Sequence, residues 1–181
     1  MPTPLRTPDR NVIYFPGSTI GNFEPHVATG FLRRIVDLCG RKGALLIGVD
    51  LQKDRRILER AYNDSKGVTA EFNLNLLQRA NHELDADFHL KQWRHEAIYN
   101  AAAGRIEMHL VSEIDQIVHI ADYEFCFRSG EKIITEFSYK YTLEGLTALA
   151  AAAGLKFVQM WTDKARLFGV FYFTCSSDAS G

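Results

Sequence analysis

The chain carries near its start the stretch NVIYFPGSTIGNFEP, residues 11–25. Its first five residues form an apolar run typical of a buried strand, and the glycines, hydroxyl residues and asparagine of GSTIGN follow where that strand should end. In open α/β sheets, ligands bind at the carboxyl ends of the strands. The stretch therefore predicts an α/β fold with a ligand-binding loop at residues 17–22.

The segments that follow complete a parallel unit. Residues 24–40 have apolar side chains at helical spacing and end at Gly40, and residues 44–49 form a continuous apolar run typical of a strand buried on both faces. A further helix is expected over residues 53–65. Strand, helix and strand within about 40 residues make one parallel crossover, so we assign residues 11–65 to a partial Rossmann-like core.

The pattern changes after a helix that we expect at residues 69–84. Apolar and polar residues alternate over 92–99, 105–112, 116–120 and 123–128, and a further strand is expected at 133–138. Alternation with a period of two predicts antiparallel strands with one face in water. Residues 66–140 are therefore expected to form an inserted, mixed α+β region.

The chain is expected to return to the first sheet over residues 141–175. A helix is predicted at 142–153, with Thr142 at its start and Gly154 after its end, and strands at 155–161 and 168–175. Residues 1–10 have no periodicity and are expected to be a linker or disordered lead-in. Residues 176–181 are expected to be a tail.

Composition excludes several classes of function. The 181 residues are 46% hydrophobic and 24% charged, with a net charge of −1, which favours neither a nucleic-acid nor a membrane partner. No apolar run approaches the roughly 18 residues that a membrane span needs. Three distant cysteines and six histidines without an HxxxH pair support neither a metal site nor a disulfide framework. The cytoplasm is the expected location.

The GSTIGN loop has the chemistry of a binding site. Gly17 and Gly21 allow the backbone to approach a ligand closely, and Ser18, Thr19 and Asn22 offer hydrogen-bond donors and acceptors. The alternative is a tight turn between strand and helix, with Asn22 or Thr19 capping the helix. The spacing alone leaves both interpretations open.

A second candidate site lies on the strand expected at residues 133–138. Glu136 and Ser138 are two residues apart and point to the same face of that strand. A carboxylate beside a hydroxyl is suited to a heteroaromatic ring that carries an N–H group, although a solvated strand face is the alternative. Tyr62 and Met108 are, on their own, an ordinary half-buried tyrosine and a core methionine.

Several separate blocks of the sequence, in the same order, resemble the histidine-specific N-alpha-methyltransferases of ergothioneine biosynthesis. The resemblance runs from about residue 11 to residue 175. The blocks are GSTIGNF (17–23), GVDLQKD (48–54), LERAYND (58–64), GVTAEFN (67–73), RIEM (105–108), GEKIITEFSYK (130–140), WTD (161–163) and FG (168–169). The resemblance implies that the chain is the C-terminal part of a class I Rossmann-like methyltransferase sheet, with a substrate-binding region inserted at residues 66–140.

The resemblance also implies an activity and a set of residues. Family members transfer methyl groups from S-adenosylmethionine (SAM) to the α-amino group of L-histidine, three times, and form the betaine hercynine. Asn22 and Tyr62 correspond to residues that contact the carboxylate of histidine. Glu136 and Ser138 correspond to residues that hold its imidazole, and Met108 to one that lines the ring pocket.

The same resemblance places Gly17 beside the substrate amine and the cofactor, and we assign its neighbours Ser18 and Thr19 to cofactor binding as well. No residue is assigned a role in proton transfer, because positioning of the amine should supply most of the rate.

The sequence departs from the family in one respect. No Gly-rich loop of the GxGxxG type follows a strand, and the nearest candidate, residues 40–43, follows a helix. We therefore expect a chain that begins at the fourth strand of the sheet, binds SAM weakly or not at all, and is weakly active or inactive on its own. We also expect it to need a missing half or a second copy to cover a sheet edge. The alternatives are a non-catalytic histidine-binding or oligomerising remnant, one half of a split methyltransferase, and a methyltransferase for another amine.

Overall fold

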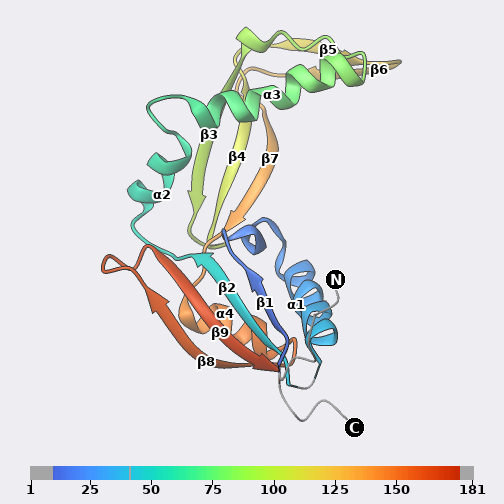
Figure 1. The fold of residues 1–181 in the computed structure, drawn as a ribbon. Coiled ribbons are helices and arrows are strands. Elements are labelled where there is room, and N and C mark those ends of the chain that lie inside the picture. The colour runs from blue at the N-terminus through green and yellow to red at the C-terminus, as the bar shows by residue number, and fades with distance from the viewer. Residues whose placement is uncertain (1–9, 41, 176–181) are drawn as a thin grey trace. The chain divides into compact units, whose positions relative to one another are not determined.

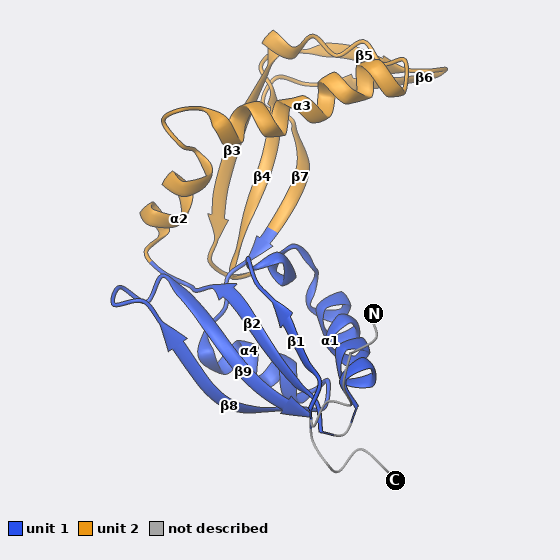
Figure 2. Cartoon of the chain, viewed as in Figure 1, with its two compact units in different colours: residues 1–53, 138–181 blue, residues 54–137 orange. Residues whose placement is uncertain are grey.

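The computed structural model describes residues 10–40 and 42–175 (Figure 1). The expectations for residues 1–9 of the lead-in and for the tail lie outside the described residues. The chain divides into two compact units, which are described separately (Figure 2). Unit 1 consists of residues 1–53 and 138–181, and unit 2 consists of residues 54–137.

Unit 1 is built on a four-stranded mixed sheet. Its strand order is β1 (Val12–Phe15), β2 (Ala44–Asp50), β9 (Phe168–Cys175) and β8 (Leu155–Thr162). β1 and β2 are parallel, which confirms the predicted crossover, whereas β9 runs antiparallel to β2 and β8. The carboxyl ends of β1 and β2 therefore lie at the same edge of the sheet, where the GSTIGN loop begins.

Two helices pack on this sheet, α1 (Pro25–Cys39) and α4 (Leu143–Ala151). α1 ends as predicted at Gly40, whose φ of 71° suits glycine and whose N–H donates to the Val36 carbonyl. Thr142 caps α4 with its hydroxyl, which accepts a hydrogen bond from the N–H of Gly145. Both predicted ends are thus explained by local backbone chemistry.

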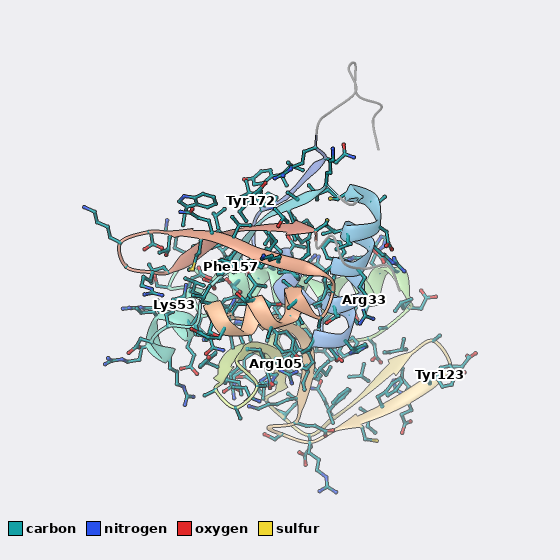
Figure 3. The ribbon with its side chains drawn as sticks, turned by 90° about the horizontal axis from the view of Figure 1, so that it is seen from below. Arg33, Lys53, Arg105, Tyr123, Phe157 and Tyr172 are labelled. Atoms are coloured by element: carbon teal, nitrogen blue, oxygen red, sulfur yellow. The ribbon has the colours of Figure 1, made fainter. Side chains whose placement is uncertain are left out.

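The core of unit 1 joins one face of the sheet to both helices. Phe157 packs against Phe171 and Phe173 within it (Figure 3). Phe157 is half-buried, whereas Phe171 and Phe173 are fully buried. Further fully buried large side chains come from the loop, α1, β2 and α4: Ile20, Leu32, Leu45, Ile47, Val49 and Leu146.

Unit 2 holds two helices, a three-stranded sheet and a hairpin. The helices are α2 (Arg55–Tyr62) and α3 (Val68–Glu83), and the sheet has the order β3 (Trp93–Asn100), β4 (Arg105–Ser112), β7 (Lys132–Tyr139). The hairpin consists of β5 (Gln116–Ile120) and β6 (Tyr123–Phe127). β3 and β4 are antiparallel, as are β5 and β6, which confirms the predicted antiparallel pairing. The prediction of one face in water is wrong for β4, because every residue from Ile106 to Ser112 is buried and the polar Glu107 pairs with Arg105.

Helix α2 is shorter than the predicted helix over residues 53–65, and that prediction is wrong at both ends. At the start, the carboxylate of Asp54 accepts a hydrogen bond from the N–H of Arg56 and caps the helix. At the end, the amide of Asn63 donates to the Ala97 carbonyl at 2.8 Å, while its oxygen accepts from the Ala97 N–H at 2.9 Å. Because Asn63 is tied to β3, the chain leaves the helix after Tyr62.

No helix among the described residues is long and apolar enough to cross a membrane. Within the same residues, no group of three or more histidine, cysteine, aspartate or glutamate side chains is arranged to hold a metal ion.

Candidate functional site

The GSTIGN loop is anchored to the end of β2 through Ser18. Its N–H donates to the Gly48 carbonyl at 3.0 Å, and its Oγ accepts a hydrogen bond from the N–H of Asp50 at 2.8 Å. Gly17 and Ser18 both have positive φ angles, 80° and 59°. Such a conformation is uncommon for serine, and the two hydrogen bonds compensate for its cost.

The rest of the loop packs on residues 139–141 of the same unit. A Cβ atom on Gly21 would lie 2.8 Å from the backbone oxygen of Tyr139, so only glycine fits there. The hydroxyl of Tyr141 donates to the Ile20 carbonyl at 3.3 Å, and burial raises the pKa of Tyr141 to about 12. The loop is therefore a fixed part of unit 1.

The capping alternative for this loop is wrong. The residue that caps α1 is Glu24, without a side-chain hydrogen bond to the helix. Thr19 and Asn22 instead bound a short 3₁₀ turn, Thr19–Asn22, and both are exposed. Neither side chain is needed to begin α1.

A buried charge cluster lies next to the loop in unit 1. The ammonium group of Lys140 lies 3.0 Å from Oδ2 of Asp50 and donates to Oγ of Ser138 at 2.8 Å. Oδ1 of Asp50 pairs with the ammonium group of Lys53, which also donates to the Leu167 carbonyl at 2.9 Å. The Lys140 side chain is only 1% exposed, so this pairing satisfies a charge that would otherwise be costly to bury.

Asp50 and Lys140 belong to two of the sequence blocks that resemble the family, but no role was predicted for either residue. Two signals were available. Asp50 follows a buried strand directly, at the edge where the loop lies, and Lys140 is two residues after Ser138 and so shares its face. Through Asp50, the structure connects Ser18 of the loop with Ser138, two residues that the sequence had assigned separately.

Among the residues predicted for the site, unit 2 contains Tyr62, Met108 and Glu136. Tyr62 is the last residue of α2 and packs against the small apolar cluster that contains Met108. Met108 is 3% exposed, and its carbonyl accepts a hydrogen bond from Thr135 Oγ1 at 3.1 Å. The structure thus brings Tyr62 and Met108 together, and Met108 is a core residue.

Glu136 and Ser138 share strand β7, two residues apart. Ser138 is 5% exposed and Glu136 is half-buried, so the alternative of a solvated strand face is wrong. Phe137 lies between these two residues in the strand. The guanidinium of Arg105 lies over the Phe137 ring, 3.5 Å from its centroid (Figure 3). This cation–π contact helps to fix the strand that carries both polar side chains.

Unit 2 also buries polar groups that sequence reasoning did not single out. Asn73 is fully buried, and its Nδ2 atom lies 2.9 Å from Nδ1 of His95 and 3.1 Å from the His109 carbonyl. Nε2 of His95 lies 2.9 Å from the Tyr62 carbonyl. Burial lowers the pKa of His109, and the positive charge of Lys132 lowers it further. The sequence offered one indication of this network, because Asn73, His95 and His109 are polar residues within helix α3, strand β3 and strand β4.

These features can be compared with known proteins. The family described as histidine-specific, SAM-dependent methyltransferases matches residues 2–175. This chain belongs to that family. The resemblance of the sequence blocks is therefore confirmed, as are the α/β methyltransferase fold and the SAM dependence of the family.

Curated relatives agree with the family. The chain is 44% identical over 163 residues to the histidine N-alpha-methyltransferase of Mycolicibacterium smegmatis, covering 89% of this chain and 51% of that protein. It is 42% identical over 163 residues to the protein of the same name from Mycobacterium tuberculosis, with the same two coverages. This member of the family thus spans about half the length of the curated relatives it matches.

Among solved structures, a SAM-dependent methyltransferase from Clostridium acetobutylicum superposes with a TM-score of 0.48 at 8% identity, covering 94% of this chain and 61% of that one. The roles of the individual residues are not tested by these comparisons. The assignments of Gly17, Ser18, Thr19 and Asn22, and of Tyr62, Met108, Glu136 and Ser138, stay predictions.

Proposed function

We propose that this chain supplies the histidine-binding site of a SAM-dependent histidine N-alpha-methyltransferase, which methylates the α-amino group of L-histidine to form hercynine. The observation that carries this proposal is the match to a histidine-specific family over residues 2–175. The structure supports it by placing a rigid loop and a buried hydroxyl, Ser138, around one charge cluster in unit 1.

In this proposal the residues hold histidine at both ends. Asn22 and Tyr62 bind its carboxylate, Glu136 and Ser138 bind its imidazole, and Met108 contacts the ring. Fixing both ends orients the α-amino group between them, and orientation alone can supply a large part of a rate enhancement. Polar anchors for the ring would also reject amino acids that lack a ring N–H group.

Gly17 and Thr19 are proposed to contact SAM, which when bound supplies an electrophilic methyl group. Both residues are exposed, and a Cβ atom on Gly17 would have only the Thr19 hydroxyl within 4 Å, at 3.9 Å. That open backbone fits a close approach by a ligand. Ser18, in contrast, already uses its Oγ to hold the loop on Asp50, so its proposed contribution to the cofactor is to keep Gly17 in place.

We also propose a division of labour along the chain. Residues 11–65 and 141–175 form the methyltransferase core, and residues 66–140 form the substrate-binding region. Among the described residues, β1 pairs only with β2, which leaves one edge of the sheet without a partner strand. We propose that another strand covers this edge, supplied by the part of the relatives that this chain does not cover or by a second copy.

A second candidate is a histidine-binding protein without methyl transfer. The observation in its favour is the lack of a GxGxxG loop after a strand in residues 1–181.

The test is thermal unfolding of the chain with histidine and SAM added separately, and L-alanine as the control ligand. A ligand at about 100 times its dissociation constant should add about 2.7 kcal/mol of stability. Stabilisation by both supports the transferase, and stabilisation by histidine alone supports the second candidate. No response to histidine would contradict both.

A further inference from the structure

We infer that Cys39 and Cys175 form an oxidation site, in which a mild oxidant joins their two thiols in a disulfide bond within one chain. Cys39 is the last residue of α1 and Cys175 is the last residue of β9, both in unit 1. Both are free thiols in the structure, and both are buried in the same hydrophobic core. The inference concerns a modification site and does not depend on the proposed function.

The backbone places both cysteines beside residues 43 and 44, where β2 begins. The Sγ atom of Cys39 donates to the Ala44 carbonyl at 3.4 Å, and the N–H of Cys175 donates to the Gly43 carbonyl at 3.0 Å. A Cβ atom on Gly43 would lie 2.1 Å from the Cβ atom of Cys39, so the glycine leaves room for this cysteine. The two cysteines therefore approach the same two residues, one from α1 and the other from β9.

The side chains also meet. Phe171, Phe173 and Cys175 are alternate residues of β9 that are all buried in this core, which Cys39 enters from α1. Burial raises the pKa of the Cys175 thiol, and the neighbouring Cys39 side chain raises it further. Proximity of the two side chains is the first requirement for a disulfide. The spacing of the cysteines in the sequence did not indicate this contact.

The oxidant that suits a buried pair is a small one, and we take hydrogen peroxide. The thiolate of one cysteine attacks a peroxide oxygen, breaks the O–O bond, becomes a sulfenic acid and releases hydroxide. The thiolate of the other cysteine attacks that sulfur, breaks the S–O bond, forms the S–S bond and releases a second hydroxide. The two thiol protons neutralise the two hydroxide ions, so two thiols and one peroxide give one disulfide and two water molecules.

The bond would act as a reversible staple. Burial keeps oxidation of the pair slow compared with that of the exposed Cys126. Once formed, the bond closes a loop that contains all of unit 2 together with β2, α4 and β8 of unit 1. Such a cross-link stabilises a protein mainly by restricting the unfolded chain. We therefore expect the oxidised chain to resist denaturant better than the reduced chain.

The experiment uses Cys126→Ser, which removes the exposed thiol of unit 2 and leaves the pair. The folded chain is treated with hydrogen peroxide, its remaining thiols are alkylated, and it is digested with trypsin, which releases Cys39 in residues 35–41 and Cys175 in residues 167–181. Mass spectrometry should find these two peptides joined, with the link lost after dithiothreitol. Urea unfolding should show a higher midpoint for the oxidised chain than for the same chain after dithiothreitol. Cys39→Ser in the same background is the matched control and should show neither change.

The inference is overturned if the oxidised chain yields no linked peptide, or if the linked peptide comes only from covalent dimers on an unreduced gel. An unchanged urea midpoint in the linked protein would overturn the stapling effect. If circular dichroism shows that Cys39→Ser does not fold, Cys175→Ser replaces it as the control. The linked peptide itself is measured on protein that keeps both cysteines, so that result depends on neither control.

Discussion

The Nδ2 atom of Asn73 lies 2.9 Å from Nδ1 of His95, in the interior of unit 2. The other ring nitrogen of His95 lies 2.9 Å from the backbone oxygen of Tyr62. Helix α3, strand β3 and the last residue of α2 are therefore joined by one histidine ring. The position of Tyr62, which we propose binds the carboxylate of histidine, therefore depends on the fully buried amide of Asn73.

We expect Asn73→Ala to destabilise the protein by about 2–3 kcal/mol, because it leaves the His95 ring and the His109 carbonyl without their buried partner. Asn75→Ala is the control, since Asn75 is exposed on the same helix and alanine favours a helix. Its effect should stay within about 0.5 kcal/mol, on the stabilising side. Urea unfolding measures both, and equal effects of the two changes would contradict the prediction.

A second prediction concerns how tightly the GSTIGN loop is packed. Gly21→Ala should destabilise the protein by about 1–3 kcal/mol, because the new methyl group would lie 2.8 Å from the Tyr139 backbone oxygen, which cannot move aside as a side chain can. Gly30→Ala is the matched control within α1, where no atom lies within 4 Å of the added carbon. That change should stabilise by about 0.5–1 kcal/mol. Urea unfolding at one pH compares the two, and a neutral Gly21→Ala would show that the loop is loosely packed.

Local patterns predicted most of the fold. The predicted bounds of β4, at residues 105–112, agree with those of the strand because polar and apolar residues alternate from Arg105 to Leu110 and Gly104 precedes the segment. Gly40 and Thr142 marked helix ends because capping is a property of a few neighbouring residues.

Contacts between distant residues could not be predicted in this way. The early end of α2 depends on hydrogen bonds between Asn63 and Ala97, which no local pattern reveals. The pairing of Asp50 with Lys140 likewise needs the sheet and the segment after β7 to be placed first. Sequence blocks identified the family, but the groups that hold Ser18 and Ser138 became visible only in the structure.

The third prediction concerns acid sensitivity. Burial, helped by Lys132, lowers the pKa of His109 below its usual 6.5, against the opposing effect of Glu107 and Glu96. As the pH falls, the unfolded chain therefore takes up a proton at this residue before the folded protein does. The stability from His109 is fully present above about pH 7 and is lost as the pH falls through 6.5 towards the lower, folded pKa.

In His109→Gln, the free energy of unfolding should fall less steeply between about pH 7.5 and pH 5.5 than in the wild type. His26→Gln is the control, because the His26 side chain is 77% exposed, and it should keep the wild-type slope. Urea unfolding at several pH values gives the slopes directly. The same slope in all three proteins would mean that His109 is not responsible for the acid sensitivity.

The last prediction tests ring recognition by Glu136. Glu136→Ala should weaken histidine binding by about 2–3 kcal/mol, the usual cost of losing a hydrogen bond to a charged group. Glu136→Gln keeps the size and one acceptor oxygen but removes the charge, so its affinity should lie between those of the wild type and Glu136→Ala. Calorimetric titration measures all three, with Glu113→Ala, an exposed glutamate of unit 2, as a control that should bind as the wild type does.

The choice of ligand separates ring recognition from a general loss of the site. L-phenylalanine has no ring nitrogen, so any residual binding of it should be insensitive to Glu136→Ala, or even improve when the carboxylate no longer has to be desolvated beside an apolar ring. If histidine and phenylalanine lose affinity in equal proportion, Glu136 supports the fold of β7 rather than the imidazole. If histidine affinity is unchanged while the variant remains folded, another residue makes the site specific for histidine.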